Sequence, residues 1–457
     1  MKFVGFLQKT LTKTRKYDIL NEVNEIRKDK KVMVLEFSCS NHRSIKEKIT
    51  FSAIASNDDT NEELLYQYGN IRVLKNAVIY GANGSGKSNL ISAIVFMKRL
   101  VTNSINNQPG TTINQQPHKI SGFSENSEYN MQFVTKGIRY AYGFSLNNTI
   151  VVDEYLYSFP KGRQVKIFER NEDGFLAGDR YKGKFDSCKD VIKPNRLFLS
   201  CAANFSAVKD TEDVFSFFKN DLIVYSGSPR SRDNWMHYSL TKMNDNSLIK
   251  ETVLTFLKGL DTGINDIVID IEKKQIEIEQ LPPIFSEEIK NEFAKRLVDR
   301  VEAKVVYNSF EVDLMKEEST GIKKLIEFLC PFIDIIINGK VLICDEIETN
   351  FHEAVLYYLV DIFKKVYSPD TPQMFFTTHD TSILDLSLFR RDQIWFTEMK
   401  RDERSTDLYS LSEIKNVRKD ENVGRGYISG KYGAIPMLNE NLASLISRLQ
   451  LKGDCND

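Results

Sequence analysis

A glycine-rich stretch that ends in lysine and serine is the part of the chain best suited to bind a phosphate. Residues 81–88 read Gly-Ala-Asn-Gly-Ser-Gly-Lys-Ser and fit the pattern G-x-x-x-x-G-K-[ST]. In this pattern backbone N–H groups close around a phosphate, the lysine reaches the β- and γ-phosphates, and the serine holds Mg²⁺. The pattern therefore predicts an ATP and Mg²⁺ site with contacts from Gly81, Asn83, Gly84, Ser85, Gly86, Lys87, Ser88 and Asn89.

The segments on either side of this phosphate-binding loop (P-loop) are those that its mechanism needs. Asn76–Tyr80 is a short apolar run with β character, and Leu90–Leu100 carries apolar residues at helical spacing. The N-terminus of that helix adds partial positive charge at the phosphate. Because a glycine-rich loop that arises by chance rarely has both flanks, we interpret the stretch as a functional P-loop.

A second apolar run, Lys340–Cys344, ends in two acids, Asp345 and Glu346. We expect Asp345 to bind Mg²⁺, directly or through water, alongside Ser88. Glu346 would be the general base that polarises the water attacking the γ-phosphate. An apolar strand that ends in Asp-Glu is common by chance, but its place after a P-loop in an α/β chain favours this function.

Two short segments complete an ordered set of four motifs. Glu318-Ser319-Thr320-Gly321 stands at a predicted helix start, where Ser319, Thr320, Gly321 and the first amides can face a γ-phosphate. A plain helix cap by Ser319 or Thr320 is the alternative. Gln373–Thr378 is a predicted strand, and His379 directly after it is placed to hydrogen-bond the γ-phosphate. The expected catalytic residues are thus Glu346, His379 and Lys87.

The start of the chain adds a strand, a turn and a second strand about forty residues before the P-loop. Val32–Phe37 and Ile49–Ala55 are the predicted strands, and Asn41-His42-Arg43-Ser44 lies in the turn between them. With this opening, the motif order resembles the SMC/RecF/OLD branch of the ABC-type ATPases, whose heads begin with an N-F-R-S-like turn. Here His42 replaces the aromatic residue. The resemblance implies that Asn41 and Arg43 lie near the nucleotide, whereas a plain polar turn is the alternative.

The same resemblance implies how the motifs work together. Ser319–Gly321 would be a degenerate ABC signature that closes on the P-loop of a second copy, so that two ATP sites form in a head-to-head dimer. Within the branch, the chain resembles the RloA-like and AbiL-like ATPases of bacterial defence operons and the AriA ATPase of the PARIS system. The segments that carry this resemblance span most of the chain from Met33 onward: LEFSCSNHRSIKEKITFS, VIYGANGSGKSNL, EESTGIKKL, LICDEIETNFH, FFTTHD and YGAIPML.

The defence group implies an anti-phage, abortive-infection switch that binds and hydrolyses ATP. Such a switch oligomerises, responds to a phage-encoded trigger protein and controls a separately encoded effector, often a nuclease. The alternative is a RecF/SMC-like DNA-repair ATPase that clamps duplex DNA. The formal net charge of −1 gives no global basic field for DNA, and no long heptad pattern is present.

Composition narrows the class of protein further. The chain has 457 residues, of which 41% are hydrophobic and 27% charged, as in soluble globular proteins. Its six cysteines show no paired spacing, which favours a reducing cytoplasm over a disulfide framework or a zinc ribbon. No apolar run is long enough to span a bilayer, so we expect no membrane partner.

The predicted fold class is α/β, an ABC-type P-loop ATPase head with a β-rich N-terminal lobe and a mainly helical insertion. Lys87 and Asp345 are 258 positions apart (345 − 87), more than the core needs between these motifs. The expected divisions are an N-terminal extension (1–31), a lobe with the P-loop and a β-meander (32–194), the insertion (195–301), and a C-terminal lobe with the signature, the acidic strand end and His379 (302–457).

Three finer expectations follow from local patterns. The meander is predicted over Glu128–Thr135, Ile138–Leu146, Ile150–Ser158 and Gln164–Arg170. A helix is predicted over Ser286–Val306. Val423–Leu438 contains four glycines and is predicted to be an ordered loop that docks against the core and exposes Arg425, Lys431 and Tyr432.

Overall fold

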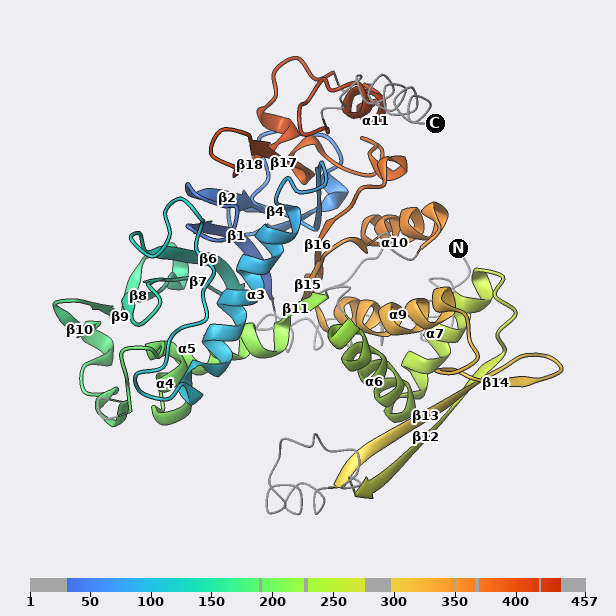
Figure 1. Ribbon diagram of the computed structural model, residues 1–457, viewed down its shortest axis with the longest axis horizontal. Helices are drawn as coiled ribbons and strands as arrows, with labels where there is room; N and C mark the ends of the chain where they lie inside the picture. The colour runs from blue at the N-terminus through green and yellow to red at the C-terminus, as the bar shows by residue number, and fades with distance from the viewer. Residues whose placement is uncertain are drawn as a thin grey trace, which may run out of the picture.

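The computed structural model describes residues 31–188, 191–225, 229–275, 297–347, 351–365, 370–418 and 421–436. These residues form two large β-sheets, one mainly parallel and one antiparallel, with helices packed beside them (Figure 1). Among the helices of this described part, none is both long and apolar enough to cross a membrane. Residues 1–30 of the predicted extension lie outside the described residues. The same holds for Leu442–Leu451, for which the sequence predicts a last short helix.

The mainly parallel sheet carries the predicted motifs. Its strand order is β11-β15-β16-β5-β17-β18, and only β18 runs antiparallel to its neighbour. The strands are β5 (Asn76–Gly81), β11 (Leu222–Tyr225), β15 (Val341–Cys344), β16 (Gln373–Thr377), β17 (Ile394–Lys400) and β18 (Ser405–Ser410). Because β15, β16 and β5 are parallel, their carboxyl ends meet at one edge, which is where ligands bind in open α/β sheets.

Alternate residues of this sheet face two separate hydrophobic cores. On one side lies the P-loop helix α3 (Lys87–Asn103), and on the other lie α9 (Thr320–Asn338) and α10 (Glu353–Lys365) (Figure 1). The first core takes Ala77, Ile79, Val341, Ile343 and Phe375, and the second takes Val78, Tyr80, Leu342, Cys344, Met374 and Phe376. The strands are therefore buried on both faces, which explains their uninterrupted apolar sequences.

The antiparallel sheet confirms the predicted opening strand pair and meander. Its order is β10-β9-β8-β7-β6-β1-β2. The strands are β1 (Met33–Ser40), β2 (Ile49–Ser52), β6 (Ser127–Thr135), β7 (Ile138–Leu146), β8 (Val151–Ser158), β9 (Val165–Asn171) and β10 (Gly174–Ala177). A small separate hairpin joins β3 (Leu65–Tyr68) to β4 (Ile71–Leu74). Sequence neighbours pair throughout the meander, so short-range alternation was sufficient to predict it.

The region expected to be a mainly helical insertion is more mixed than predicted. It contains α4 (Phe198–Phe205), α5 (Lys209–Ser216), α6 (Pro229–Asp245) and α7 (Ser247–Gly259). However, β11 joins the mainly parallel sheet directly beside β15, so this part of the region belongs to the sheet that carries the P-loop. The expected boundary at 301–302 also falls inside a strand, β13 (Leu297–Val306).

A long antiparallel ribbon replaces the helix predicted over Ser286–Val306, which is wrong for Leu297–Val306. β12 (Asp266–Gln275) pairs along its whole length with β13, and β14 (Glu311–Asp313) adds a short third strand. Along β13, Val301, Ala303 and Val305 alternate with Glu302 and Lys304, a period of two that outweighs the helical pattern. Figure 1 shows the ribbon passing beside α6, and Ile267, Ala303 and Val305 of the ribbon share a buried core with residues of α6 and α9.

The glycine-containing C-terminal segment forms a six-residue helix, α11 (Val423–Ile428), followed by a turn. The segment docks on the P-loop strand, because the ring of Tyr427 packs against Tyr80 and Phe396. The expectation that Tyr432 is exposed is wrong: its ring stacks on Phe396 and only 3% of the residue is accessible. Burial of these aromatic rings against β5 and β17 helps to order the segment.

Candidate nucleotide-binding site

The P-loop runs from the end of β5 into the first turn of α3, as its sequence predicts. Gly86 has φ +113°, and a Cβ there would lie 2.0 Å from Oγ1 of Thr406, so only glycine fits. The buried Ser85 hydroxyl shares a 2.6 Å hydrogen bond with Thr397 and faces the interior, where it holds the loop to β17. Asn83 and Gly84 are exposed at the tip of the loop.

Lys87 lies beneath the loop with its ammonium group directed at backbone carbonyls. Its Nζ donates to the carbonyl oxygen of Gly81 at 2.8 Å and to that of Ala82 at 3.4 Å. Only 5% of the residue is accessible, so the charge is largely withdrawn from water. A desolvated ammonium inside a ring of backbone amides suits a multiply charged phosphate.

Ser88 and Asp345 meet at the carboxyl edge of the sheet. The Ser88 hydroxyl donates to Oδ1 of Asp345 at 3.2 Å. Ser88 is exposed and Asp345 is half-buried, so both oxygens can be reached from solvent. A hydroxyl and a carboxylate are hard oxygen donors, and Mg²⁺ in phosphate sites is held by such a small protein set together with phosphate oxygens and water. The donor set therefore fits the expected metal.

Glu346 follows Asp345 in a left-handed backbone conformation with φ +50°. Its N–H donates to the hydroxyl oxygen of Thr377 at 2.7 Å, and that hydroxyl donates to Oδ1 of Asp345 at 2.8 Å. Thr377 was not among the predicted site residues. Threonine is a common strand residue, and only the pairing of β16 with β15 brings it to the two acids.

His379 is exposed just beyond the end of β16, at the same edge of the sheet. The next residue, Asp380, accepts a 2.9 Å hydrogen bond on its carbonyl oxygen from the hydroxyl of Tyr80. Tyr80 belongs to the P-loop strand. The loop that carries His379 is therefore attached to the strand that positions the phosphate contacts.

Ser319 caps α9, as the alternative to a signature role predicted. Its Oγ accepts from the N–H of Ile322 at 3.3 Å, and its own N–H donates to Glu318 at 2.8 Å. Ser319, Thr320 and Gly321 are all exposed at the start of the helix. Because α9 and α3 pack on opposite faces of the sheet, this helix start is not joined to its own P-loop by any hydrogen bond found among the described residues.

The opening turn packs beside α3, and the side chain of Asn41, predicted to lie near the nucleotide, is buried in hydrogen bonds to a neighbouring loop. The Asn41 side chain is 1% exposed, donates to the carbonyl oxygens of Gly122 and Glu125, and accepts from the N–H of His118. The nitrogen and the oxygen of the Asn41 amide thus both hold a surface loop. The local sequence does not predict the path of that loop.

The remaining polar residues of the turn face different ways. Arg43 is exposed, with φ +51°. The side-chain amide of Asn89, expected at the nucleotide, donates to Oγ of Ser44 at 2.6 Å, and Ser44 also shares a 2.6 Å bond with Thr406. These contacts link the opening turn, α3 and β18. Ser44 was missed because its role depends on a partner 362 residues away.

His42 is buried between α3 and β6. Its two ring nitrogens lie 2.8 Å from the hydroxyl of Tyr129 and 3.1 Å from that of Ser92. Burial, with a smaller contribution from the Arg43 charge, lowers the pKa of His42 to about 4. The imidazole is therefore neutral at pH 7 and fills the position that the family pattern gives to an aromatic ring.

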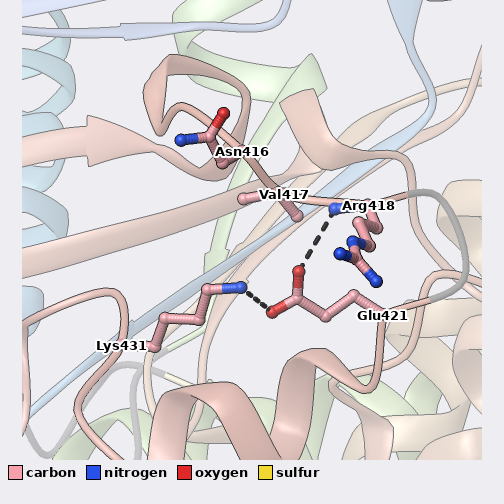
Figure 2. A pocket seen from close by; sticks show the side chains of 5 residues that line it. All are labelled: Asn416, Val417, Arg418, Glu421 and Lys431. Carbon is pink, nitrogen blue, oxygen red and sulfur yellow. Dashed lines mark hydrogen bonds and ion pairs between the residues drawn. The ribbon is translucent and has the colours of Figure 1, made fainter.

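A cavity of about 660 Å³ lies elsewhere, beside the C-terminal segment (Figure 2). Asn416, Val417, Arg418, Glu421 and Lys431 line it. Glu421 accepts from the Arg418 N–H at 3.1 Å and pairs with the Lys431 ammonium. None of the predicted site residues lines this cavity, and the Glu421 carboxylate in it is already paired with the Lys431 ammonium. The carboxyl edge of the sheet is thus the better candidate site.

Comparison with known proteins agrees with the P-loop assignment. A family model described as "AAA domain, putative AbiEii toxin, Type IV TA system" matches residues 77–181, from the P-loop strand through the meander. No curated protein sequence matches the chain. The matched segment begins in β5 and includes the P-loop. The strand order and the Ser88–Asp345 contact agree with an α/β P-loop fold.

Three solved structures of SMC heads are similar to the chain, each at 12% identity. One is an SMC head bound to the C-winged helix domain of ScpA, with a TM-score of 0.40 over 83% of this chain and 99% of that one. The head domain from Thermotoga maritima gives 0.38 over 82% and 98%. A head with an extended coiled coil, bound to the C-terminal domain of ScpA derived from Pyrococcus furiosus, gives 0.38 over 84% and 97%.

Proposed function

We propose that the chain binds ATP with Mg²⁺, hydrolyses it, and acts as a molecular switch in bacterial anti-phage defence. The observation that carries the ATPase proposal is the 3.2 Å contact of Ser88 with Asp345. It joins the P-loop to the acidic strand end at the one edge where Lys87, Glu346 and His379 are also found. Each of these residue types has a distinct task in phosphoryl transfer to water.

The tasks follow from the positions of the side chains. The loop amides and Lys87 hold the β- and γ-phosphates. Ser88 and Asp345 hold Mg²⁺, which when bound neutralises negative charge on the phosphate oxygens. Glu346 orients the attacking water and takes its proton, and His379 donates to the γ-phosphate.

A second copy of the chain completes the switch. Ser319–Gly321 is exposed at the start of α9, and α9 lies on the face of the sheet opposite α3. This arrangement favours a contact of the signature with the γ-phosphate on a partner copy over a contact with its own. ATP then shifts the equilibrium toward the closed dimer, because the contact exists only in that state. Hydrolysis through Glu346 removes the contact and reopens the dimer.

The biological setting is the finer part of the proposal. The matched family's description names a toxin–antitoxin system, and the sequence resembles ATPases of defence operons. Both support a cytoplasmic switch that responds to a phage-encoded trigger protein and controls a separately encoded effector, a nuclease. ATP-driven association is the step through which a trigger or an effector would act.

The test uses Glu346→Gln, which should bind ATP but not hydrolyse it. The variant would be expressed with its flanking gene, purified with and without ATP and Mg²⁺, and weighed by native mass spectrometry. An ATP-dependent multimer that carries the neighbouring gene product supports the proposal. The matched control, Lys87→Ala, should not assemble. A bare dimer or monomer that binds duplex DNA with steep salt dependence would favour the repair-clamp alternative instead.

A further inference from the structure

We infer that Thr377 is a positioning residue for ATP hydrolysis, holding the metal ligand Asp345 and the general base Glu346 in one arrangement. This inference rests on the proposed ATPase function. It concerns a fully buried side chain, and it assigns to one hydroxyl the coupling of two neighbouring acids.

The geometry around Thr377 is fully specified. The residue ends β16, which lies between the acidic strand β15 and the P-loop strand β5, and it has no accessible surface. Its Oγ1 donates to Oδ1 of Asp345 at 2.8 Å and accepts from the N–H of Glu346 at 2.7 Å. A hydroxyl has one proton to donate, so the donated bond goes to the carboxylate and the accepted bond to the amide.

Each bond has a separate consequence. The bond to Asp345 leaves that oxygen with two hydroxyl donors, Thr377 and Ser88, and fixes the rotation of the carboxylate. The bond from Glu346 stabilises a backbone with φ +50°, a conformation that costs a non-glycine residue roughly 1 kcal/mol or more. Without the Thr377 hydroxyl, the Glu346 N–H would lose this acceptor and the backbone could relax, moving the Glu346 side chain.

The same residue connects the acids to the γ-phosphate sensor. His379 follows Thr377 by two positions, and Thr378 holds the start of that loop by accepting from the N–H of Asp380 at 3.0 Å. A movement of β16 therefore acts on Asp345, Glu346 and His379 together. Thr377 therefore links the contact of His379 with the γ-phosphate to the alignment of the general base, Glu346.

The test compares Thr377→Val, which removes the hydroxyl at nearly constant volume, with Thr377→Ser, which keeps it. Two quantities are measured on the full chain: the hydrolysis rate at saturating ATP, and the Mg²⁺ concentration that half-saturates binding of a fluorescent ATP analogue. The control is Thr135→Val in β6. Thr135 is equally buried, but its hydroxyl has no hydrogen-bond partner among the described residues.

We expect Thr377→Val to lower the rate by about tenfold to a hundredfold, the range for losing a hydrogen bond to a charged group. The half-saturating Mg²⁺ concentration should rise by about tenfold for the same reason. Binding of the analogue in EDTA should stay unchanged. Thr377→Ser should restore the rate and the Mg²⁺ response, and Thr135→Val should match the parent chain in both.

Other outcomes separate this inference from the proposed function. If Thr377→Val hydrolyses ATP and responds to Mg²⁺ like the parent chain, the inference is overturned while the ATPase proposal stands. A lower melting temperature with an unchanged Mg²⁺ response would mean a purely structural role and would also overturn it. If the parent chain itself neither binds nor hydrolyses ATP, the proposed function fails first. Thr377→Ala replaces the valine variant if that variant does not fold.

Discussion

Ser88 donates a hydrogen bond to Asp345 at 3.2 Å, although 257 positions of sequence separate the two residues. Asp345 follows the end of β15, and Ser88 lies in the first turn of α3, just after the P-loop that leaves β5. Because β16 lies between β15 and β5, the contact crosses the carboxyl ends of three parallel strands. The order of the strands therefore fixes the spacing of the two oxygens through backbone pairing. Because the site is already assembled in this way, little binding free energy is lost in ordering it when a ligand binds.

The first prediction concerns Lys87. Lys87→Ala should weaken ATP binding by about tenfold to a hundredfold or more, because it removes charge-assisted hydrogen bonds to the phosphates. Isothermal titration calorimetry on the purified chain measures this directly. Lys182→Ala, which removes an exposed lysine far from the loop in sequence, is the control and should bind ATP like the parent chain. Retained affinity in Lys87→Ala would contradict the assigned site.

The second prediction separates the two roles of Ser319. Ser319→Asp keeps an acceptor for the N–H of Ile322 and so keeps the helix cap, but it places negative charge where a partner's γ-phosphate should lie. We expect normal thermal stability together with loss of ATP-dependent association and of ATPase activity. Ser319→Arg should also abolish both by steric obstruction.

Analytical ultracentrifugation with and without ATP measures this association, in a Glu346→Gln background that retains the nucleotide. Ser319→Thr is the control, since it keeps both the cap and the neutral hydroxyl. If Ser319→Arg hydrolyses ATP and associates like the parent chain, the signature does not act on a partner copy, and the cap is its only role.

Local patterns were sufficient to predict the P-loop, the acidic strand end and the meander, because each depends on residues close together in the sequence. The predictions failed where long-range pairing decides. β11 is a four-residue run among helices, and only its pairing with β15 assigns it to the sheet that carries the P-loop. Likewise, Leu297–Val306 is a strand because it pairs with β12, and the prediction of a helix there did not include this pairing.

Contacts between distant parts of the sequence also decide the roles of single residues in the site, and the sequence does not predict these contacts. In the sequence, Thr377 has no feature that distinguishes it from other strand threonines. Its role follows from the two acids that the end of β15 places beside it. The sequence also does not predict that the carbonyl oxygens of Gly122 and Glu125 accept from the amide of Asn41. In both cases the residue type was visible in the sequence, but the partner that determines its role comes from another part of the chain.

The third prediction concerns a buried ion pair that joins two segments more than 300 positions apart in the sequence. Arg390 and Asp392 form two hydrogen bonds of 3.0 and 2.9 Å, and both are almost fully buried. Asp392 also accepts from the N–H and hydroxyl of Ser56, and Arg390 donates to the carbonyl oxygen of Asp58. The pair thus connects the segment before β3 to the segment before β17.

Asp392→Ala should lower the free energy of unfolding by about 3–5 kcal/mol, because it leaves a buried guanidinium without its counter-charge. Urea unfolding followed by circular dichroism measures the change. Asp179→Ala removes the acid of an exposed pair with Lys182 and should leave the unfolding midpoint unchanged. A similar small effect for Asp392→Ala would show that the interior there is more solvated than the burial of Arg390 implies.

The last prediction is a pH dependence that originates at His42. The pKa of this histidine is lowered to about 4 in the folded chain, mainly by burial, and is about 6.5 when the chain is unfolded. Between these two values the unfolded state binds the extra proton, so the stability contributed by neutral His42 is complete above pH 6.5 and is lost as the pH falls toward 4. The loss attributable to this one group should reach about 2 kcal/mol at pH 5.

His42→Phe tests this dependence, since phenylalanine cannot be protonated and can pack against Phe96 and Tyr129 as the imidazole does. The variant should lose stability at pH 7, because the hydroxyls of Tyr129 and Ser92 lose a hydrogen-bond partner. Its stability should nevertheless fall less than that of the parent chain between pH 7 and pH 5, as measured by urea unfolding. His237→Gln, at an exposed histidine of α6, should keep the parent dependence. Parallel curves for His42→Phe and the parent chain would show that His42 does not carry the acid sensitivity.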